Sequence, residues 1–144
     1  MPDTEQNIRL DELFSEAPGD TGFEKEIYRI GDLAREFGVT LRTLRFYEDR
    51  GLVSPERDGS TRLYSPRDRA RLKVILLAKQ VGFSLVEIQE LMAIYDKSED
   101  MEDPAGVLLD RFTEQLDVLV RQRNEMDAAI EKLKRTIQAF EAAS

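Results

Sequence analysis

The stretch "YRIGDLAREFGVTLRTLRFYEDRGL", residues 28–52, decides the fold of this chain. Its apolar residues recur at helical spacing until Gly38, a residue that readily takes the left-handed conformation at a helix end. Thr40 then offers the hydroxyl that caps a second helix, which Gly51 ends. Two helices joined by a short turn of this kind predict a helix-turn-helix over residues 30–50.

A helical wheel of the second helix separates an apolar side from a basic and aromatic side. Leu41 and Leu44 share the apolar side, which we expect to pack on the first helix. The opposite side and its flanks carry Arg42, Thr43, Arg45, Phe46, Tyr47 and Arg50. The spacing therefore predicts one packed face and one basic, aromatic face on this helix.

The segment that follows predicts a β-hairpin and then two helices. Asp58-Gly59 is a turn signal between two short strand-like runs, so residues 52–65 are interpreted as a two-stranded wing. The sequence "SPRD", residues 65–68, combines a serine cap, a proline suited to the first helical position and an aspartate that completes a capping box. A second capping box, "SLVE" at residues 84–87, begins the next helix.

The last part of the sequence carries one long amphipathic pattern. After an acidic linker at residues 96–104, apolar residues alternate by three and four over residues 105–142, which predicts a coiled-coil helix about 57 Å long. The apolar stripe consists of Leu109, Phe112, Leu116, Leu119, Met126, Ile130, Leu133, Ile137 and Phe140. A domain this small cannot cover such a stripe, so we expect it to pair with the same helix of a second subunit.

Charge is unevenly distributed along the 144 residues, whose formal net charge is −8. Residues 28–82 hold 12 basic and 7 acidic residues, a net charge of +5. Residues 1–27 hold 2 basic and 8 acidic residues, and residues 83–144 hold 7 basic and 14 acidic residues. The positive segment can attract polyanions at short range, because salt screens charges that lie farther away than about 10 Å. We expect residues 1–26 to form a flexible acidic arm.

The composition excludes several kinds of chemistry. There is no cysteine and no histidine, so the sequence contains no thiolate nucleophile, imidazole base or Cys/His metal site. No base, nucleophile or phosphate-cradling loop accompanies acidic pairs such as Glu24 and Glu26, so we expect the protein not to be an enzyme. No apolar run is long enough to cross a bilayer and the acidic N-terminus is unlike a secretory signal, so we expect a cytoplasmic protein.

The order of these elements and three local motifs resemble the MerR family of bacterial transcription regulators. The matching residues are "YRIGDLAREFGVTLRTLRFYEDRGLVSP" from Tyr28, "RLY" at Arg62–Tyr64 and "VGFSLVEIQEL" from Val81. The resemblance covers residues 27–95 closely and the predicted coiled coil in layout. Within the family, "TRLYSPRDRARLKVIL" is similar to the cysteine-free regulators of proteobacterial catabolic operons, such as the LiuR type. That similarity hints at control of branched-chain amino-acid or fatty-acid breakdown.

The resemblance implies a mainly α-helical fold, with a winged helix-turn-helix DNA-binding domain followed by a long dimerisation coiled-coil helix. It also implies a homodimer that binds a pseudo-palindromic operator in double-stranded promoter DNA and distorts it for RNA polymerase. The residues that match the family's DNA contacts are Thr40, Arg42, Thr43, Arg45, Tyr47, Arg62, Tyr64 and Lys79. Thr61 stands where many relatives have a wing tyrosine, so we expect the wing to bind DNA either less tightly or differently.

No cofactor is expected. Metal-sensing relatives use cysteines, so sensing of thiophilic metals is excluded for this sequence. We also expect no large drug-binding domain of the kind that other members carry after the coiled coil. We therefore expect either a small effector of unknown identity between the helical layers or no effector at all.

Several alternatives stay open at this point. Arg45 can pair with Glu48 or Asp49 on its own helix, in place of DNA. The aromatic residues Phe46, Tyr47 and Tyr64 can serve in packing alone. The alternative function is a protein-interaction adaptor, in which the coiled coil binds another protein and the DNA-binding module is degenerate.

Overall fold

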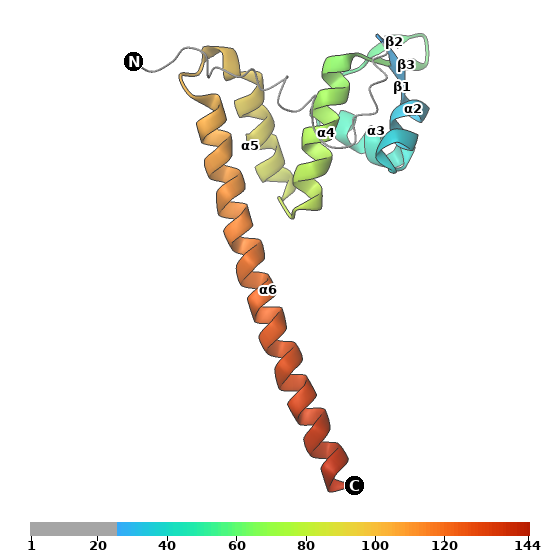
Figure 1. The fold of residues 1–144 in the computed structure, drawn as a ribbon. Coiled ribbons are helices and arrows are strands. Elements are labelled where there is room, and N and C mark those ends of the chain that lie inside the picture. Colours follow the sequence, from blue (N-terminus) through green and yellow to red (C-terminus); the bar gives the residue numbers. More distant parts are fainter. Residues whose placement is uncertain (1–25) are drawn as a thin grey trace. The chain divides into compact units, whose positions relative to one another are not determined.

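The structure is a computed structural model that describes residues 26–144, so the predicted acidic arm lies, except for Glu26, outside the described residues. The elements in chain order are β1 (Tyr28–Arg29), α2 (Ile30–Phe37), α3 (Leu41–Asp49), β2 (Glu56–Asp58), β3 (Thr61–Tyr64), α4 (Pro66–Gln80), α5 (Leu85–Asp96), the short 3₁₀ helix η2 (Ser98–Asp100) and α6 (Pro104–Ala143) (Figure 1). The chain divides into two compact units between Ala105 and Gly106. The predicted fold class, a winged helix-turn-helix with a long C-terminal helix, is confirmed.

The ends of α2 and α3 show why these residues form two separate helices. Gly38 has φ 66°, and its backbone N–H donates to the carbonyl oxygen of Ala34. A side chain is disfavoured in this left-handed conformation, so glycine suits the position. Two residues later the hydroxyl of Thr40 accepts a hydrogen bond of 3.1 Å from the backbone N–H of Thr43. This contact caps α3 and fixes the turn between the two helices.

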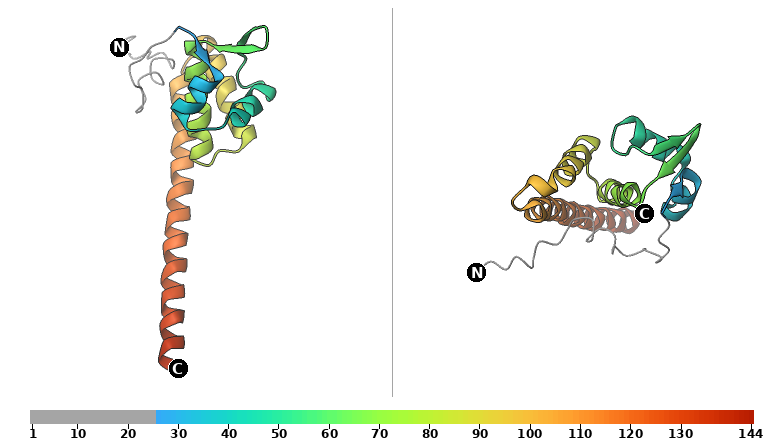
Figure 2. Two further views of the ribbon diagram at one scale, coloured as in Figure 1. Left: turned by 90° about the vertical axis from the view of Figure 1, so that its right-hand side faces the viewer. Right: turned by 90° about the horizontal axis from the view of Figure 1, so that it is seen from above.

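A three-stranded antiparallel sheet adjoins the helix-turn-helix (Figure 2). Its strand order is β1-β3-β2. The hairpin of β2 and β3 is the predicted wing, and Arg57 lies opposite Arg62 in its register. Sequence analysis missed β1, which pairs Tyr28 with Tyr64 and Arg29 with Leu63. A strand of two residues is too short to show an alternating pattern, and only its pairing partner defines it.

The core of the first unit is apolar and joins all of its helices. The residues that are almost fully buried include Leu33, Leu44, Leu72, Ile75, Ile88 and Met92. Burial of one such side chain contributes about 1.5–3 kcal/mol relative to leaving it exposed. These residues come from α2, α3, α4 and α5. The helix-turn-helix formed by α2 and α3 therefore shares one core with α4 and α5.

Two arginines of α4 tie the surrounding elements together. Arg69 is buried, and its Nε donates to the two carboxylate oxygens of Glu36 on α2 at 3.0 and 2.9 Å. The guanidinium of Arg71 donates to the carbonyl oxygen of Leu52 at 2.7 Å and forms an ion pair with Asp96 at the end of α5. Through these contacts α4 connects the first helix of the helix-turn-helix, the segment before the wing and α5.

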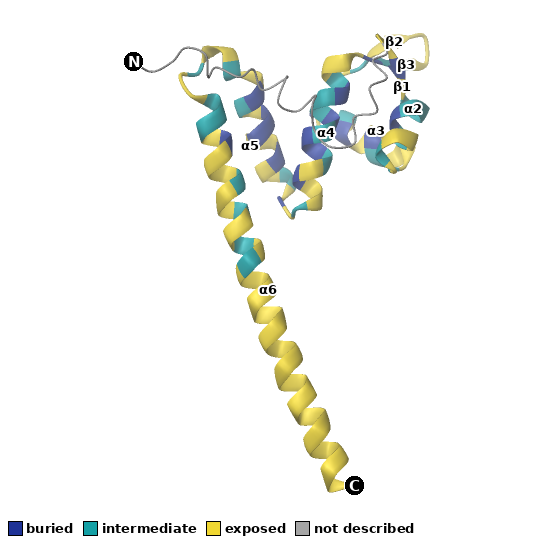
Figure 3. Ribbon diagram, viewed as in Figure 1, coloured by how far each residue is buried: buried dark blue, intermediate teal, exposed yellow. Residues whose placement is uncertain are grey.

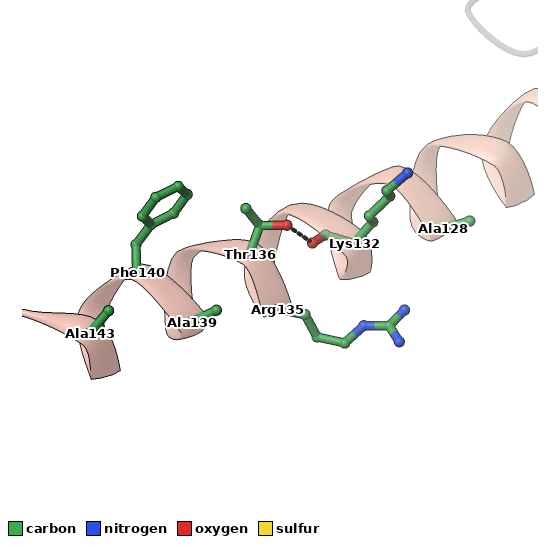
Figure 4. A pocket seen from close by; sticks show the side chains of 7 residues that line it. All are labelled: Ala128, Lys132, Arg135, Thr136, Ala139, Phe140 and Ala143. Carbon is green, nitrogen blue, oxygen red and sulfur yellow. Dashed lines mark hydrogen bonds between the residues drawn. The ribbon is translucent and has the colours of Figure 1, made fainter.

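Helix α6 spans 40 residues. The predicted apolar stripe runs along it, and most of the stripe is exposed to solvent; the side chain of Leu133, for example, is 61% exposed (Figure 3). A shallow depression near its C-terminal end is lined only by residues of α6 itself, Ala128, Lys132, Arg135, Thr136, Ala139, Phe140 and Ala143 (Figure 4). It therefore has no second wall. Within residues 26–144, no helix has the length and apolarity that a membrane span requires.

Candidate nucleic-acid interface

Helix α3 presents one face to the core and one face to solvent. Leu44 and Tyr47 are buried, whereas Arg42 and Arg45 are exposed. Among the residues that the structure describes, neither of these two arginines has an acidic partner within salt-bridge distance. No acidic side chain of residues 26–144 neutralises either charge, and the alternative in which Arg45 pairs with Glu48 or Asp49 is not observed.

The first turn of α3 differs from the expected wheel in one respect. Leu41 was predicted to pack beside Leu44, but its side chain is 40% exposed. The buried direction of the helix lies between Leu44 and Tyr47, and Leu41 is the first residue of α3, at the edge of that contact. An aliphatic side chain thus stands beside Arg42 on the exposed face. Apolar groups at this place in a recognition helix can contact the methyl group of thymine.

The hydroxyl groups at the N-terminus of α3 are held together. The oxygens of Thr40 and Thr43 lie 3.0 Å apart, while Thr40 also accepts the backbone N–H of Thr43. Both threonines belong to the predicted DNA-binding set. Their position next to the free N–H groups of a helix start gives a region that favours anions.

An aromatic cluster follows on the C-terminal half of α3. The ring centroids of Phe46 and Tyr47 are 5.6 Å apart in an edge-to-face arrangement with an interplanar angle of 65°. The guanidinium carbon of Arg50 lies 5.0 Å from the centroid of the Phe46 ring. This cation–π contact holds Arg50 beside Phe46, which is itself exposed.

Glu48 connects α3 to the wing. One oxygen of its carboxylate accepts a hydrogen bond of 2.8 Å from Arg57 on β2, and the other accepts one of 2.5 Å from Arg62 on β3. Burial by itself would raise the pKa of Glu48, but the hydrogen bonds and charges of the two arginines outweigh it and lower the pKa below the usual 4.5. The hydrogen bond to Glu48 in turn raises the pKa of Arg62. The stability that this cluster contributes is present above about pH 4.5 and is lost as the pH falls through the lowered pKa of Glu48.

The predicted DNA-binding residues do not all lie together. Thr40, Arg42, Thr43 and Arg45 lie together on α3, and Arg62 is joined to α3 through Glu48. Lys79 is exposed in the last turn of α4, about 20 Å along that helix from the wing, and does not belong to this cluster. Arg57, which was not in the predicted set, lies opposite Arg62 in the hairpin and shares Glu48 with it.

Tyr47 and Tyr64 belong to the core. Tyr64 is 0% exposed, and its hydroxyl has no hydrogen-bond partner among the described residues. Burial raises the pKa of both tyrosines. In this conformation Tyr64 packs beneath the wing and presents no surface to a phosphate. Its assignment as a DNA contact stays a prediction. Tyr47 is 5% exposed and lies on the face of α3 that packs into the core.

Tyr64→Phe is expected to raise the free energy of unfolding by about 1 kcal/mol, because it removes a buried hydroxyl without a partner. Thermal unfolding of both proteins at equal concentration measures this change. Affinity for promoter DNA should stay the same. A loss of stability, or a clear loss of affinity, would show that the hydroxyl makes a contact that the described residues do not provide.

The geometry supports binding of an anionic polymer. Arginine donates hydrogen bonds in a planar fork that fits both the phosphate group and the edge of guanine. The exposed face of α3 carries arginines at its N-terminal half, and the wing adds two more. In the described part of the chain, no group of acidic residues has an arrangement suited to a metal ion.

Comparison with known proteins agrees with this geometry. Residues 28–94 match the family model of the MerR HTH family regulatory protein, and residues 69–138 match the model described as MerR, DNA binding. The chain is 34% identical over 111 residues to the HTH-type transcriptional regulator ZntR of Escherichia coli (strain K12), an alignment that covers 74% of this chain and 78% of ZntR.

Two solved structures share the fold. A MerR-family transcriptional regulator from Bacillus cereus aligns with a TM-score of 0.64 and 27% identity, over 80% of this chain and 83% of that one. HiNmlR, described as a MerR family regulator lacking the sensor domain and bound to promoter DNA, aligns with a TM-score of 0.59 and 24% identity, over 73% of this chain and 79% of that one.

These matches extend over both the helix-turn-helix and most of α6. The matched relatives are named as transcription regulators, which are not enzymes, so the expectation that the protein is not an enzyme is confirmed. The finer placement beside LiuR-type regulators stays a prediction. The chain belongs to the MerR family of helix-turn-helix transcription regulators.

Proposed function

We propose that this regulator binds a pseudo-palindromic operator in promoter DNA as a homodimer, and that it distorts the DNA so that RNA polymerase can use the promoter. The observation that carries the proposal is the exposed face of α3. In a chain with a net charge of −8, Arg42 and Arg45 stand side by side on one helix without acidic partners among the described residues.

The proposed interface divides into base-reading and phosphate-binding parts. A recognition helix enters the major groove with its N-terminal residues toward the base edges, and Arg42 lies in the first turn of α3. Thr40 and Thr43 lie where backbone phosphates flank the groove, and Arg45 can serve either part. The wing arginine Arg62 is assigned to phosphate beside the groove. Lys79, in the last turn of α4, is assigned to a separate phosphate outside this cluster.

The domain boundaries follow from the same proposal. Residues 27–95 form the DNA-binding domain, with the helix-turn-helix at 30–50 and the wing at 52–65. Residues 96–104 link it to the coiled coil of residues 105–142. Residues 1–26 form the acidic N-terminal segment of the sequence, of which the structure describes only Glu26. Because its partner is promoter DNA, the protein acts in the cytoplasm.

The exposed stripe of α6 supports the homodimer. An apolar stripe with alternating spacings of three and four residues is the pattern that two helices bury against each other. The stripe residues are Leu109, Phe112, Leu116, Leu119, Met126, Ile130, Leu133, Ile137 and Phe140, and the single polar interruption is Arg123. Two copies in antiparallel pairing place two α3 helices on two half-sites, which matches the symmetry of a palindromic operator.

The regulated genes and the effector are a further part of the proposal. The sequence has no cysteine, so its signal differs in chemistry from a thiolate-bound metal. The similarity of residues 61–76 to LiuR-type regulators supports a catabolic operon, with a small organic effector or none. The activity of the promoter in cells supplied with branched-chain amino acids or fatty acids tests this point.

The experiment that tests the proposed function is binding to fragments of the gene's own promoter region, titrated with salt and competitor DNA. We expect tight binding to one inverted repeat, with an affinity that falls linearly with salt on logarithmic axes, because phosphate contacts release counterions. A dimer that shows no preference over competitor DNA would contradict the proposal and favour the protein-interaction adaptor.

A further inference from the structure

The wing contains an arginine pair that the hairpin alone would disfavour. Arg57 and Arg62 are directly opposite each other in the register of β2 and β3. Like charges at opposite positions of an antiparallel pair are destabilising. Glu48 resolves this conflict, because its two carboxylate oxygens each accept a hydrogen bond from one of the two arginines.

The bonds in this cluster leave most donors unused. Arg57 contributes one terminal nitrogen to Glu48, and Arg62 contributes its Nε. A guanidinium has five N–H donors, so both arginines keep further donors for another acceptor. The side chain of Arg57 is 47% exposed, and that of Arg62 is 18% exposed.

The net charge of the cluster is positive, so it can attract an anion. Two guanidinium groups and one carboxylate carry a net charge of +1, and the lowered pKa of Glu48 keeps its carboxylate ionised at neutral pH. A phosphate can therefore be bound without displacing Glu48. The carboxylate acts as a fixed support, in the way that outer carboxylates orient the ligands of a metal site.

We propose that Glu48 is a positioning residue that fixes the wing to α3, and that it aims Arg57 and Arg62 at the phosphate backbone of DNA. This inference rests on the proposed function and adds two residues to it, Glu48 and Arg57. It also gives the wing a defined position relative to α3. The phosphates that the wing binds then lie at a fixed distance from the bases that α3 contacts.

Asp49 provides a matched control for Glu48. It is the next residue of α3, it is exposed, and it forms no hydrogen bond or ion pair with the wing arginines. Its charge acts on Arg62 only from a distance and more weakly than that of Glu48. Glu48→Gln and Asp49→Asn each remove one negative charge from the same helix with little change in shape. A general charge effect would make both variants bind DNA more tightly, since both reduce repulsion of phosphate.

The test is the affinity of the full-length dimer for its promoter fragment, measured over a range of salt concentrations. Asp49→Asn is expected to bind as tightly as the wild type or more tightly, with an unchanged salt slope. Glu48→Gln keeps one acceptor oxygen and so can hold only one of the two arginines. It is therefore expected to bind about 10-fold more weakly, and its slope should fall by about 2, because each subunit loses one phosphate contact. If the two variants behave alike, or if Glu48→Gln keeps the full slope, the inference is overturned.

Further variants keep the inference testable if Glu48→Gln disturbs the fold. Arg57→Ala changes a half-exposed wing residue, and it should also reduce the salt slope by about 2. In a background that carries both Arg57→Ala and Arg62→Ala, Glu48→Gln should have no further effect on the salt slope, because both guanidinium groups that Glu48 positions are already absent. Wild-type affinity of Arg57→Ala would overturn the inference while leaving the proposed function intact. Failure of the wild type itself to prefer its promoter would instead contradict the proposed function.

Discussion

Leu133→Glu is expected to dissociate the homodimer and, with it, to abolish tight binding to the operator. Leu133 lies in the apolar stripe of α6 and is 61% exposed in the single chain. In a symmetric dimer the substitution occurs twice, and each copy loses about 1.5–3 kcal/mol of side-chain burial. The total of at least about 3 kcal/mol corresponds to a loss of more than 100-fold in dimer affinity, before the cost of burying two carboxylates is added.

A control for this prediction lies on the opposite face of the same helix. Ala128 is also exposed, and on a helical wheel it points away from Leu133. Ala128→Glu adds the same charge to the same helix, but it should leave both the dimer and DNA binding unchanged. Sedimentation analysis over a range of concentrations measures the dimer, and mobility shift on the promoter fragment measures binding. A Leu133→Glu variant that remains a fully active dimer would rule out the stripe as the interface.

Arg42→Ala and Arg45→Ala are expected to weaken operator binding strongly while leaving the dimer and the fold intact. A good arginine contact to a base edge contributes about 1–3 kcal/mol of discrimination, and a dimer contains two copies. We therefore expect a loss of at least about 30-fold for a base-reading arginine. Neither side chain has an acidic partner among the described residues, so its removal should cost little stability.

The two arginines should differ in what they lose. An arginine that reads a guanine edge should, when replaced, lose preference for one base pair while its salt slope changes little. An arginine that binds phosphate should weaken all sequences alike and reduce the salt slope by about 2 in the dimer. The matched control is Arg121→Ala on α6, which removes the same charge outside the proposed interface. Equal affinity of all three variants and the wild type would contradict the assignment of α3 as the recognition helix.

The helix ends were predictable because their signals are local. The turn at Gly38 and the caps at Thr40, Ser65 and Ser84 depend on residues within about one helical turn of each other. Each was recognised from residue type and spacing alone. Periodicity likewise located the stripe of α6, since a repeat over many turns needs no knowledge of its partner.

The features that were missed depend on residues far apart in the sequence. Strand β1 exists only through its pairing with β3, and Glu48 meets Arg62 across 14 positions of the chain. Burial of Tyr64 depends on how the wing packs, which a helical wheel or strand pattern does not describe. The two-strand wing was therefore correct in outline, but its bond to α3 and the role of Arg57 needed the three-dimensional structure.

The uninterrupted length of α6 restricts how this chain can change by insertion and deletion. Removal of seven residues shortens the helix by about 10 Å and leaves the stripe in phase, because two turns are removed together. Removal of a single residue rotates everything beyond it by about 100° and turns the stripe beyond that point away from the proposed partner helix. Insertions and deletions that preserve the stripe should therefore come in multiples of seven residues. The length of α6 in related sequences should then differ in steps of about 10 Å.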